Sequence, residues 1–159
     1  TLVKHFQYIY EANRTHLTKQ CIKEDVLQMM QLLGLRQGEH LLERYPFELS
    51  GGMAQRVAFI MSLIRRPDYL FLDEPTSALD QGNVKKFMHY LLKAQERYQM
   101  TIVFITHDIN LVKDFATHIS IMQQGQLIES GEAASILTKP THSYTKKLIT
   151  IAHRRQLYA

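Results

Sequence analysis

Apolar residues recur at helical spacing in two stretches of the first 66 residues. Residues 1–45 are predicted to be helical, and Gly34 is a plausible helix stop. From Met53 to about Arg65 the pattern is again helical, and Ser50 can cap this second helix. The apolar positions are Ile22, Val26, Met29, Met30 and Leu33 in the first stretch, and Val57, Ile60, Met61 and Ile64 in the second.

The pattern changes after Pro67. The runs YLFLD (69–73) and TIVFIT (101–106) are apolar without alternation, which predicts strands buried on both faces. The segment between them predicts a helix that begins near Asp80, with inward-facing Val84, Phe87, Met88, Leu91 and Leu92. Strand, helix and strand in this order predict a parallel pair joined by a crossover.

The remaining third of the chain predicts small elements. Asp108 can cap a short helix, and residues 118–130 read as a hairpin that turns near Gly125. Two short helices are expected near 132–137 and 143–154. The fold class is therefore α/β, with a parallel sheet, an antiparallel edge hairpin and a helical part.

Composition narrows the class of protein. The chain is 45% hydrophobic and 21% charged, which is typical of a globular domain. The net charge of +4 and the scattered basic residues give no argument for nucleic acid as a partner. A single cysteine, Cys21, excludes an internal disulfide and fits a reducing compartment, and no apolar run is long enough to span a bilayer.

Polar residues follow both predicted strands. Asp73 and Glu74 end the first, and Thr106, His107 and Asp108 follow the second. Because ligands of open parallel sheets bind beyond the carboxyl ends of the strands, these groups are expected at one edge. Adjacent carboxylates can divide two tasks, since one can hold Mg²⁺ and the other can orient or deprotonate water. Phosphoryl transfer requires this division.

The segment ELSGGMAQ (48–55) offers a second candidate. A serine and two glycines open a helix there, and a helix N-terminus with accessible amides favours anions. Taken singly, each of these features is more often a cap, a turn or a structural histidine. Their occurrence together and in order argues for a nucleotide-related site.

Four segments in this order identify a resemblance. LSGGMAQRV, YLFLDEP, SALD and ITHD resemble the signature, Walker B, D-loop and switch-histidine motifs of ABC-type ATPases. The resemblance implies the C-terminal portion of the P-loop NTPase-like ABC ATPase fold. Residues 1–66 would form the helical subdomain with the signature helix, and residues 67–159 the C-terminal part of the RecA-like core.

The resemblance also implies roles for individual residues. Asp73 would position Mg²⁺, Glu74 would be the catalytic base, and His107 would contact the γ-phosphate of ATP. The signature residues implied to contact nucleotide are Ser50, Gly51, Gly52 and Gln55. The D-loop, implied to communicate across a dimer, comprises Ser77, Ala78, Leu79 and Asp80.

A finer resemblance concerns transported cargo. RYPFELSGGM and KPTHSYTKKLI are similar to ATPase subunits of the oligopeptide, dipeptide and nickel import branch, which often carries a His-Pro-Tyr-Thr element. His142, Tyr144 and Thr145 fit that element, and Ser143 replaces its proline. The implied partners are membrane permease subunits and a second, identical or different, ATPase subunit, on the cytoplasmic face of the plasma membrane.

The phosphate-binding motif G-x-x-x-x-G-K-[ST], called the P-loop, does not occur in this sequence, because none of its seven glycines is followed by Lys-Ser or Lys-Thr. The chain is expected to begin just after the Q-loop of the family. Because the P-loop supplies most phosphate contacts, we expect the chain alone to bind Mg-ATP weakly or not at all and to be inactive by itself. Isothermal titration checks this, and micromolar affinity would contradict it.

Two alternatives stay open from sequence. The chain could be a non-catalytic remnant of a split gene, which an in-frame P-loop in the DNA upstream of Thr1 would argue against. It could also be a soluble ABC ATPase acting on ribosomes or DNA, although the tandem cassettes and long insertions usual in that class are not visible. A pull-down with permease subunits separates this alternative from the importer.

Overall fold

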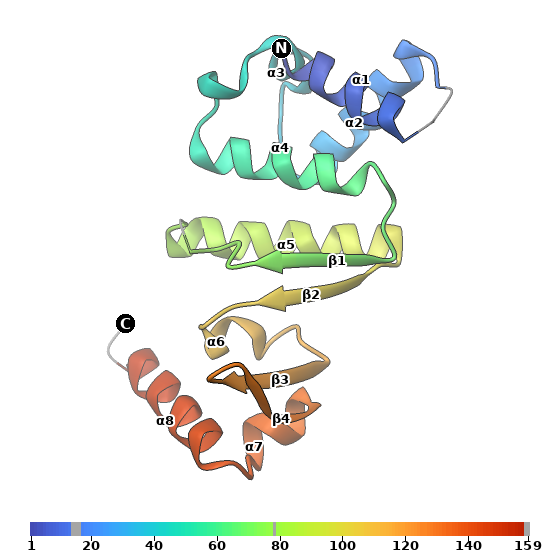
Figure 1. Cartoon of the computed structure of the whole chain (residues 1–159). Helices are drawn as coiled ribbons and strands as arrows, with labels where there is room; N and C mark the ends of the chain where they lie inside the picture. Colours follow the sequence, from blue (N-terminus) through green and yellow to red (C-terminus); the bar gives the residue numbers. More distant parts are fainter. Residues whose placement is uncertain (14–16, 78, 158–159) are drawn as a thin grey trace. The chain divides into compact units, whose positions relative to one another are not determined.

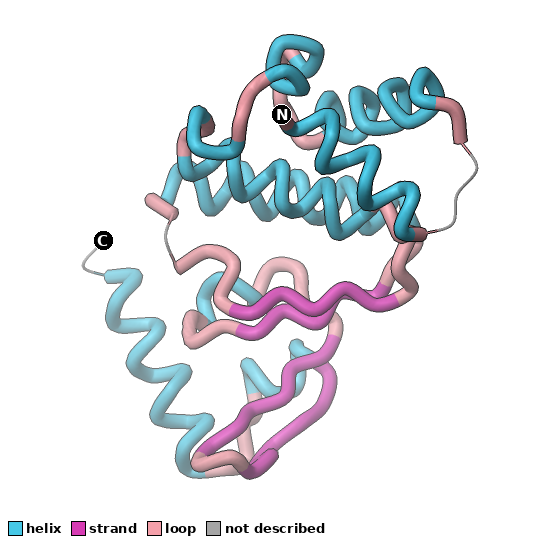
Figure 2. The backbone as a smooth tube through the Cα atoms, turned by 45° about the horizontal axis from the view of Figure 1, so that its top comes forward, coloured by secondary structure: helices cyan, strands magenta, loops and turns pink. Residues whose placement is uncertain are grey.

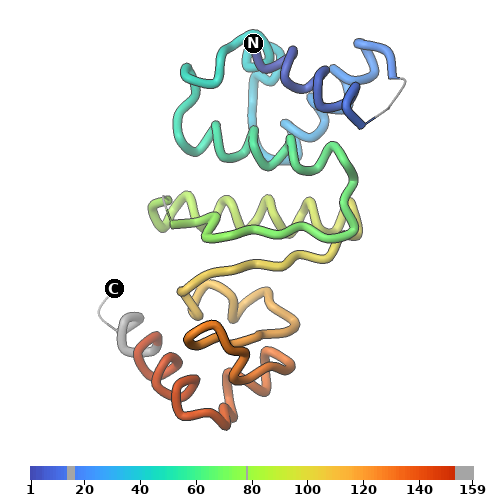
Figure 3. Tube along the Cα trace, viewed as in Figure 1, coloured from blue at the N-terminus to red at the C-terminus, as the bar shows by residue number. Residues whose placement is uncertain are grey.

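The chain forms two compact units in the computed structural model (Figures 1 and 3), Thr1–Ile105 and Thr106–Ala159. The structure describes residues 1–13, 17–77 and 79–157, with side chains described up to residue 152. The sequence division at residues 66 and 67 concerns family subdomains and stays a prediction. The compact units divide later because the first strand pair and its crossover helix belong with the preceding helices.

Helices make up the first part of the first unit. Thr18 caps the second of them by accepting a hydrogen bond from the Cys21 amide at 3.3 Å. The predicted apolar stripe of this helix is buried, and Gly34 follows its end with φ +67°. The elements are α1 (Leu2–Ala12), α2 (Lys19–Leu32), α3 (Gly38–Glu43), the 3₁₀ helix η1 (Pro46–Glu48) and α4 (Gly51–Leu63).

A three-residue network joins these helices. The Tyr10 hydroxyl of α1 donates to the Asp25 carboxylate of α2, and Arg66, just after α4, pairs with the same carboxylate at 3.2 Å. Burial, followed by the hydrogen bond to Asp25, raises the pKa of Tyr10. The Arg66 guanidinium also lies 5.1 Å from the centre of the Tyr98 ring. This network ties the helical layer to the far end of the crossover helix.

The crossover connection was predicted correctly. Strand β1 (Tyr69–Asp73) pairs in parallel with β2 (Thr101–Ile105), and α5 (Gln81–Tyr98) joins them. Figure 2 shows the two strands side by side below the helices. Helix α4 packs on α5, with the rings of Phe59 and Phe87 5.9 Å apart. The register pairs Asp73 with Ile105, so both strands end at the same edge.

Burial of both strand faces was a wrong prediction. Leu70 is buried, but Tyr69 is 64% exposed and Phe71 is 68% exposed. Successive side chains of a strand point to opposite faces, and the helices of this unit cover the face that carries Leu70. An uninterrupted apolar run cannot tell whether a second layer covers the other face.

The prediction that Leu92 of α5 faces inward was also wrong. The buried stripe of this helix runs through Phe87, Met88, Leu91 and Ala94, at spacings of one, three and three residues. Leu92 lies beside this stripe and is 39% exposed. The apolar character of Leu92 suggested burial, whereas the phase of the helix decides its exposure.

The second unit contains α6 (Ile109–Val112), β3 (His118–Gln123), β4 (Gln126–Glu132), α7 (Ala133–Thr138) and α8 (Ser143–Leu157). The antiparallel pair β3–β4 turns through Gln124 and Gly125, both with positive φ, as the hairpin prediction required. Its small core consists of Ile119, Ile121, Ala133 and Ile136. Among the described residues, no helix has the length and apolar character needed to cross a membrane.

Candidate functional site

The signature segment begins helix α4. Ser50 has extended backbone angles, and its hydroxyl accepts a weak hydrogen bond from the Met53 amide at 3.4 Å. A methyl group added at Gly51 or Gly52 would meet no atom within 4 Å, and neither residue has positive φ. Neither backbone strain nor packing inside this chain therefore requires glycine here. The open amide surface at the start of a 13-residue helix suits an anion or another backbone approaching from outside.

The two carboxylates lie where β1 ends. Asp73 is the exposed last residue of the strand, whereas Glu74 is half-buried and has φ +44°. Such a conformation is rare for a residue with a side chain and needs support from its surroundings. The Glu74 amide donates to the Ile105 carbonyl at 3.0 Å, and its carbonyl accepts from the Ser77 amide and hydroxyl at 3.2 and 3.0 Å.

The D-loop segment is fixed by a helix cap. The Asp80 carboxylate accepts hydrogen bonds from the Asn83 backbone amide at 2.9 Å and from the Asn83 side chain at 2.5 Å, and Asp80 thereby caps α5. These two hydrogen bonds, the backbone one first, hold the pKa of Asp80 below its usual value. Leu79 is held by a hydrogen bond from its amide to the Thr76 carbonyl at 3.1 Å. Ala78 lies outside the described residues.

A cleft of about 380 Å³ joins these segments. Its walls come from the start of α4, the turn after β1 and the start of α5. The Gln55 side chain crosses from one wall to the other, because its amide donates to the Pro75 carbonyl. The lining residues are Gly51, Gly52, Gln55, Glu74, Pro75, Ser77, Leu79, Asp80 and Asn83.

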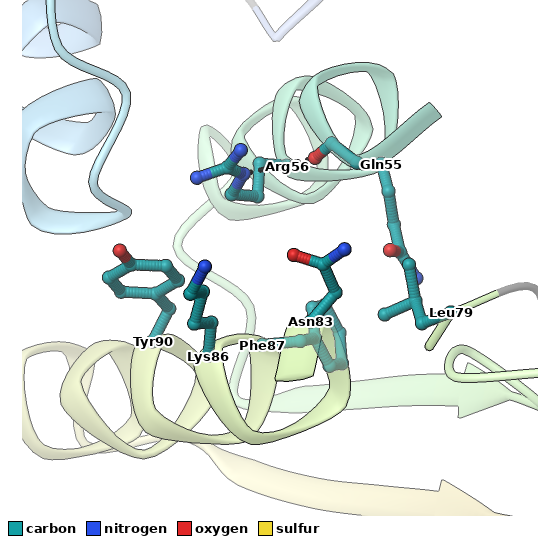
Figure 4. A pocket seen from close by; sticks show the side chains of 8 residues that line it. Gln55, Arg56, Leu79, Asn83, Lys86, Phe87 and Tyr90 are labelled. Carbon is teal, nitrogen blue, oxygen red and sulfur yellow. Dashed lines mark hydrogen bonds between the residues drawn. The ribbon is translucent and has the colours of Figure 1, made fainter. Parts of the chain in front are cut away.

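A smaller hollow of about 20 Å³ adjoins the cleft along the same two helices. Figure 4 shows Arg56 on α4 facing Lys86 and Tyr90 on α5. The Arg56 Nε atom donates to the Gly52 carbonyl at 2.9 Å, and its guanidinium lies 5.9 Å from the centre of the Tyr90 ring. Arg56 therefore stabilises the first turn of α4 and also contacts α5.

The structure thus brings together most of the residues predicted from sequence. Asp73 adjoins the cleft through Glu74 but is not a lining residue. His107 is exposed and belongs to the second unit, where Asp108 caps α6 through the Asn110 amide at 3.0 Å. Sequence reasoning missed Pro75 and Asn83 as lining residues, although the position of Asn83 three residues after a capping aspartate was a usable signal.

Within the described residues, no group of three or more His, Cys, Asp or Glu side chains could hold a metal ion. Mg²⁺ at nucleotide sites often has only one or two protein carboxylates and takes its other ligands from phosphates and water. The exposed Asp73 carboxylate fits that mode of binding.

The His142–Thr145 element has a structural role in the second unit. Glu129 of β4 accepts hydrogen bonds from the Thr141 amide at 2.7 Å, the Thr141 hydroxyl at 2.8 Å and the His142 amide at 3.2 Å. The Nδ1 atom of His142 accepts from the Tyr144 amide at 3.1 Å, at the start of α8. The Thr145 side chain is fully buried, and its hydroxyl acts on the Glu129 carboxylate. Among the described residues, this hydroxyl makes no hydrogen bond of regular geometry.

Acid is expected to weaken this cluster. The Thr145 hydroxyl, followed by the Thr141 amide, lowers the pKa of Glu129 from 4.5 to about 2. A lowered folded-state pKa stabilises the protein above pH 4.5, and the contribution is lost as the pH falls from 4.5 toward 2. Glu129→Gln should therefore lower the unfolding temperature at pH 7 and leave it nearly equal to wild type near pH 2. Thermal unfolding across this range checks it, with Glu132→Gln, an exposed residue of the same strand, as control. Equal pH profiles for wild type and Glu129→Gln would contradict the assignment.

Comparison with known proteins decides the family. The model of the ABC transporter family matches residues 2–77. The dipeptide transport ATP-binding protein DppD of Haemophilus influenzae is 41% identical over 143 residues, which are 89% of this chain and 43% of that relative. The chain belongs to the ABC transporter family. The resemblance of its motifs and the predicted α/β fold class are thereby confirmed.

Two further relatives are also named as ATP-binding proteins of transport systems. The oligopeptide transport ATP-binding protein OppD of Mycoplasma pneumoniae is 33% identical and aligns with 87% of this chain and 33% of its own length. The glutathione import ATP-binding protein GsiA of Pectobacterium atrosepticum is 33% identical and aligns with 90% of this chain and 23% of its own length. This ABC chain therefore spans less than half the length of the relatives it matches.

Proposed function

We propose that this ABC chain is part of the ATP-hydrolysing subunit of a membrane importer for peptides or nickel-like cargo. One observation carries the proposal: the open signature loop, Glu74 and the D-loop line one cleft. The names of the relatives, which are ATP-binding proteins for dipeptide, oligopeptide and glutathione transport, support peptides as the cargo.

The proposed chemistry assigns different tasks to the two carboxylates. Glu74 accepts a proton from the water that attacks the γ-phosphorus of ATP. The bond between the γ-phosphorus and the oxygen that bridges it to the β-phosphorus breaks, and ADP leaves with that oxygen. Asp73 holds Mg²⁺, which when bound offsets charge on the phosphate oxygens. His107 donates to a γ-phosphate oxygen.

The open start of α4 serves nucleotide held by a second ATPase subunit, identical or different. Ser50 offers its hydroxyl, and Gly51 and Gly52 offer backbone amides at positions where an added Cβ would meet no atom within 4 Å. Ser77, Leu79 and Asp80 present the D-loop to that subunit, and Ala78 belongs to the same motif. Permease subunits bind near residues 1–45, so that the protein works peripherally at the cytoplasmic face of the membrane.

Reconstitution tests this function. The full-length ATPase would be co-purified with permease subunits and assayed in proteoliposomes for ATP hydrolysis with and without peptide. We expect permease binding and hydrolysis that depends on Mg²⁺. Binding to ribosomes or DNA without permease binding would favour the soluble ATPase, and hydrolysis absent from every assembly would favour the non-catalytic remnant.

A further inference from the structure

Gln55 bridges two segments that are 20 residues apart in the sequence. It lies in the second turn of α4, is half-buried, and donates through Nε2 to the carbonyl of Pro75. Figure 4 shows its side chain extending from α4 toward the segment that carries Leu79. Its amide is thus directed to the chain's own backbone across the cleft.

The carbonyl that Gln55 holds belongs to the strained turn after β1. Glu74, the preceding residue, has φ +44°, and such a conformation persists only where its surroundings fix it from several sides. The Ile105 carbonyl and Ser77 supply two of these restraints. Gln55 adds a third from a different element, the helix that begins at the signature loop.

We infer that Gln55 is a positioning residue, which couples the signature loop to the turn that carries Glu74 and the D-loop. This replaces the nucleotide contact that the family resemblance implied for Gln55. Displacement of the helix that begins after Ser50 is transmitted to Pro75 through the side chain of Gln55. A change at the signature loop therefore shifts the orientation of Glu74 in the same chain. The coupling rests on the proposed function for its catalytic consequence, but the bridge itself does not.

Hydrogen exchange tests the bridge without any ATPase activity. In the 159-residue chain, the amides of Ser77 and Leu79 are hydrogen-bonded within the turn, to Glu74 and Thr76. Gln55→Glu keeps the shape of the side chain and replaces its donor with an acceptor that repels the carbonyl. We expect these two amides to exchange roughly fivefold to tenfold faster, as loss of one hydrogen bond implies. The Leu35 amide, which is bonded to Met30 elsewhere in the unit, should not change.

Matched variants separate the bridge from general destabilisation. Gln31→Glu makes the same chemical change at an exposed position of α2 and should exchange like wild type. Gln55→Lys restores a donor of similar reach and should recover most of the protection. If Gln55→Glu does not fold, Gln55→Leu carries the same comparison. Unchanged exchange at Ser77 and Leu79 in the folded variants would overturn the inference.

Steady-state kinetics in the assembled transporter test the coupling. A positioning role predicts that Gln55→Glu lowers kcat at least tenfold with KM for ATP within twofold of wild type. A nucleotide contact predicts a raised KM instead, and that result would overturn the positioning role. If the wild-type assembly has no turnover, the proposed function fails, while the exchange experiment still decides whether Gln55 holds the turn.

Discussion

Replacing Glu74 with glutamine is expected to abolish ATP turnover in the full-length transporter ATPase while nucleotide binding is retained. A general base contributes about 10²- to 10⁴-fold to rate, and the amide of glutamine cannot accept the proton of the attacking water. Phosphate release by the assembled transporter measures the first effect, and equilibrium binding of Mg-ATP measures the second.

The Glu74→Gln substitution is expected to keep the backbone conformation of the turn. The hydrogen bonds between residue 74 and its partners Ile105 and Ser77 use the backbone amide and carbonyl of residue 74, so glutamine leaves these bonds in place. The exposed Glu96 of α5 provides a matched control, and Glu96→Gln should turn over like wild type. Wild-type turnover by Glu74→Gln would remove Glu74 from the proposed mechanism.

Replacing Gly34 with alanine is expected to cause the largest loss of stability among single methyl additions in the first unit. Gly34 has φ +67°, which costs a residue with a side chain about 1–2 kcal/mol. The added methyl carbon would also lie 2.0 Å from the Tyr90 hydroxyl oxygen and 2.5 Å from the ring carbon that bears it. Together these effects should lower the free energy of unfolding by about 2–4 kcal/mol in chemical denaturation.

Two other glycines separate the causes of that loss. Gly125 has φ +77° with open space around its Cβ position, so Gly125→Ala measures strain without a clash. Gly51 has neither constraint, and Gly51→Ala should change stability by less than about 0.5 kcal/mol. In a double-mutant cycle, Tyr90→Ala should recover the steric part of the Gly34→Ala loss. If Gly34→Ala is no worse than Gly51→Ala, neither the strain nor the contact with Tyr90 is real.

The local pattern of the sequence was enough for most elements. The spacing of apolar residues in α2 and α5 predicted both helices, the second beginning near Asp80. Ser50 and Asp108 were identified as caps because capping depends on neighbours three residues away at most. The signature and Walker B motifs predicted the family, which the comparisons confirmed. The roles of Asp73, Glu74 and His107 stay predictions.

Tertiary structure decided what depends on contacts between distant segments. An apolar run gives no sign of which strand face is covered, so the exposure of Tyr69 and Phe71 emerged only when the helices packed on one side. The bond from Gln55 to Pro75 joins residues whose separation carries no periodic signal. Sequence by itself determined the elements and their chemical groups, because these follow from local spacing. The packing of α4 and α5 against the end of β1 determined which of those groups share a cleft.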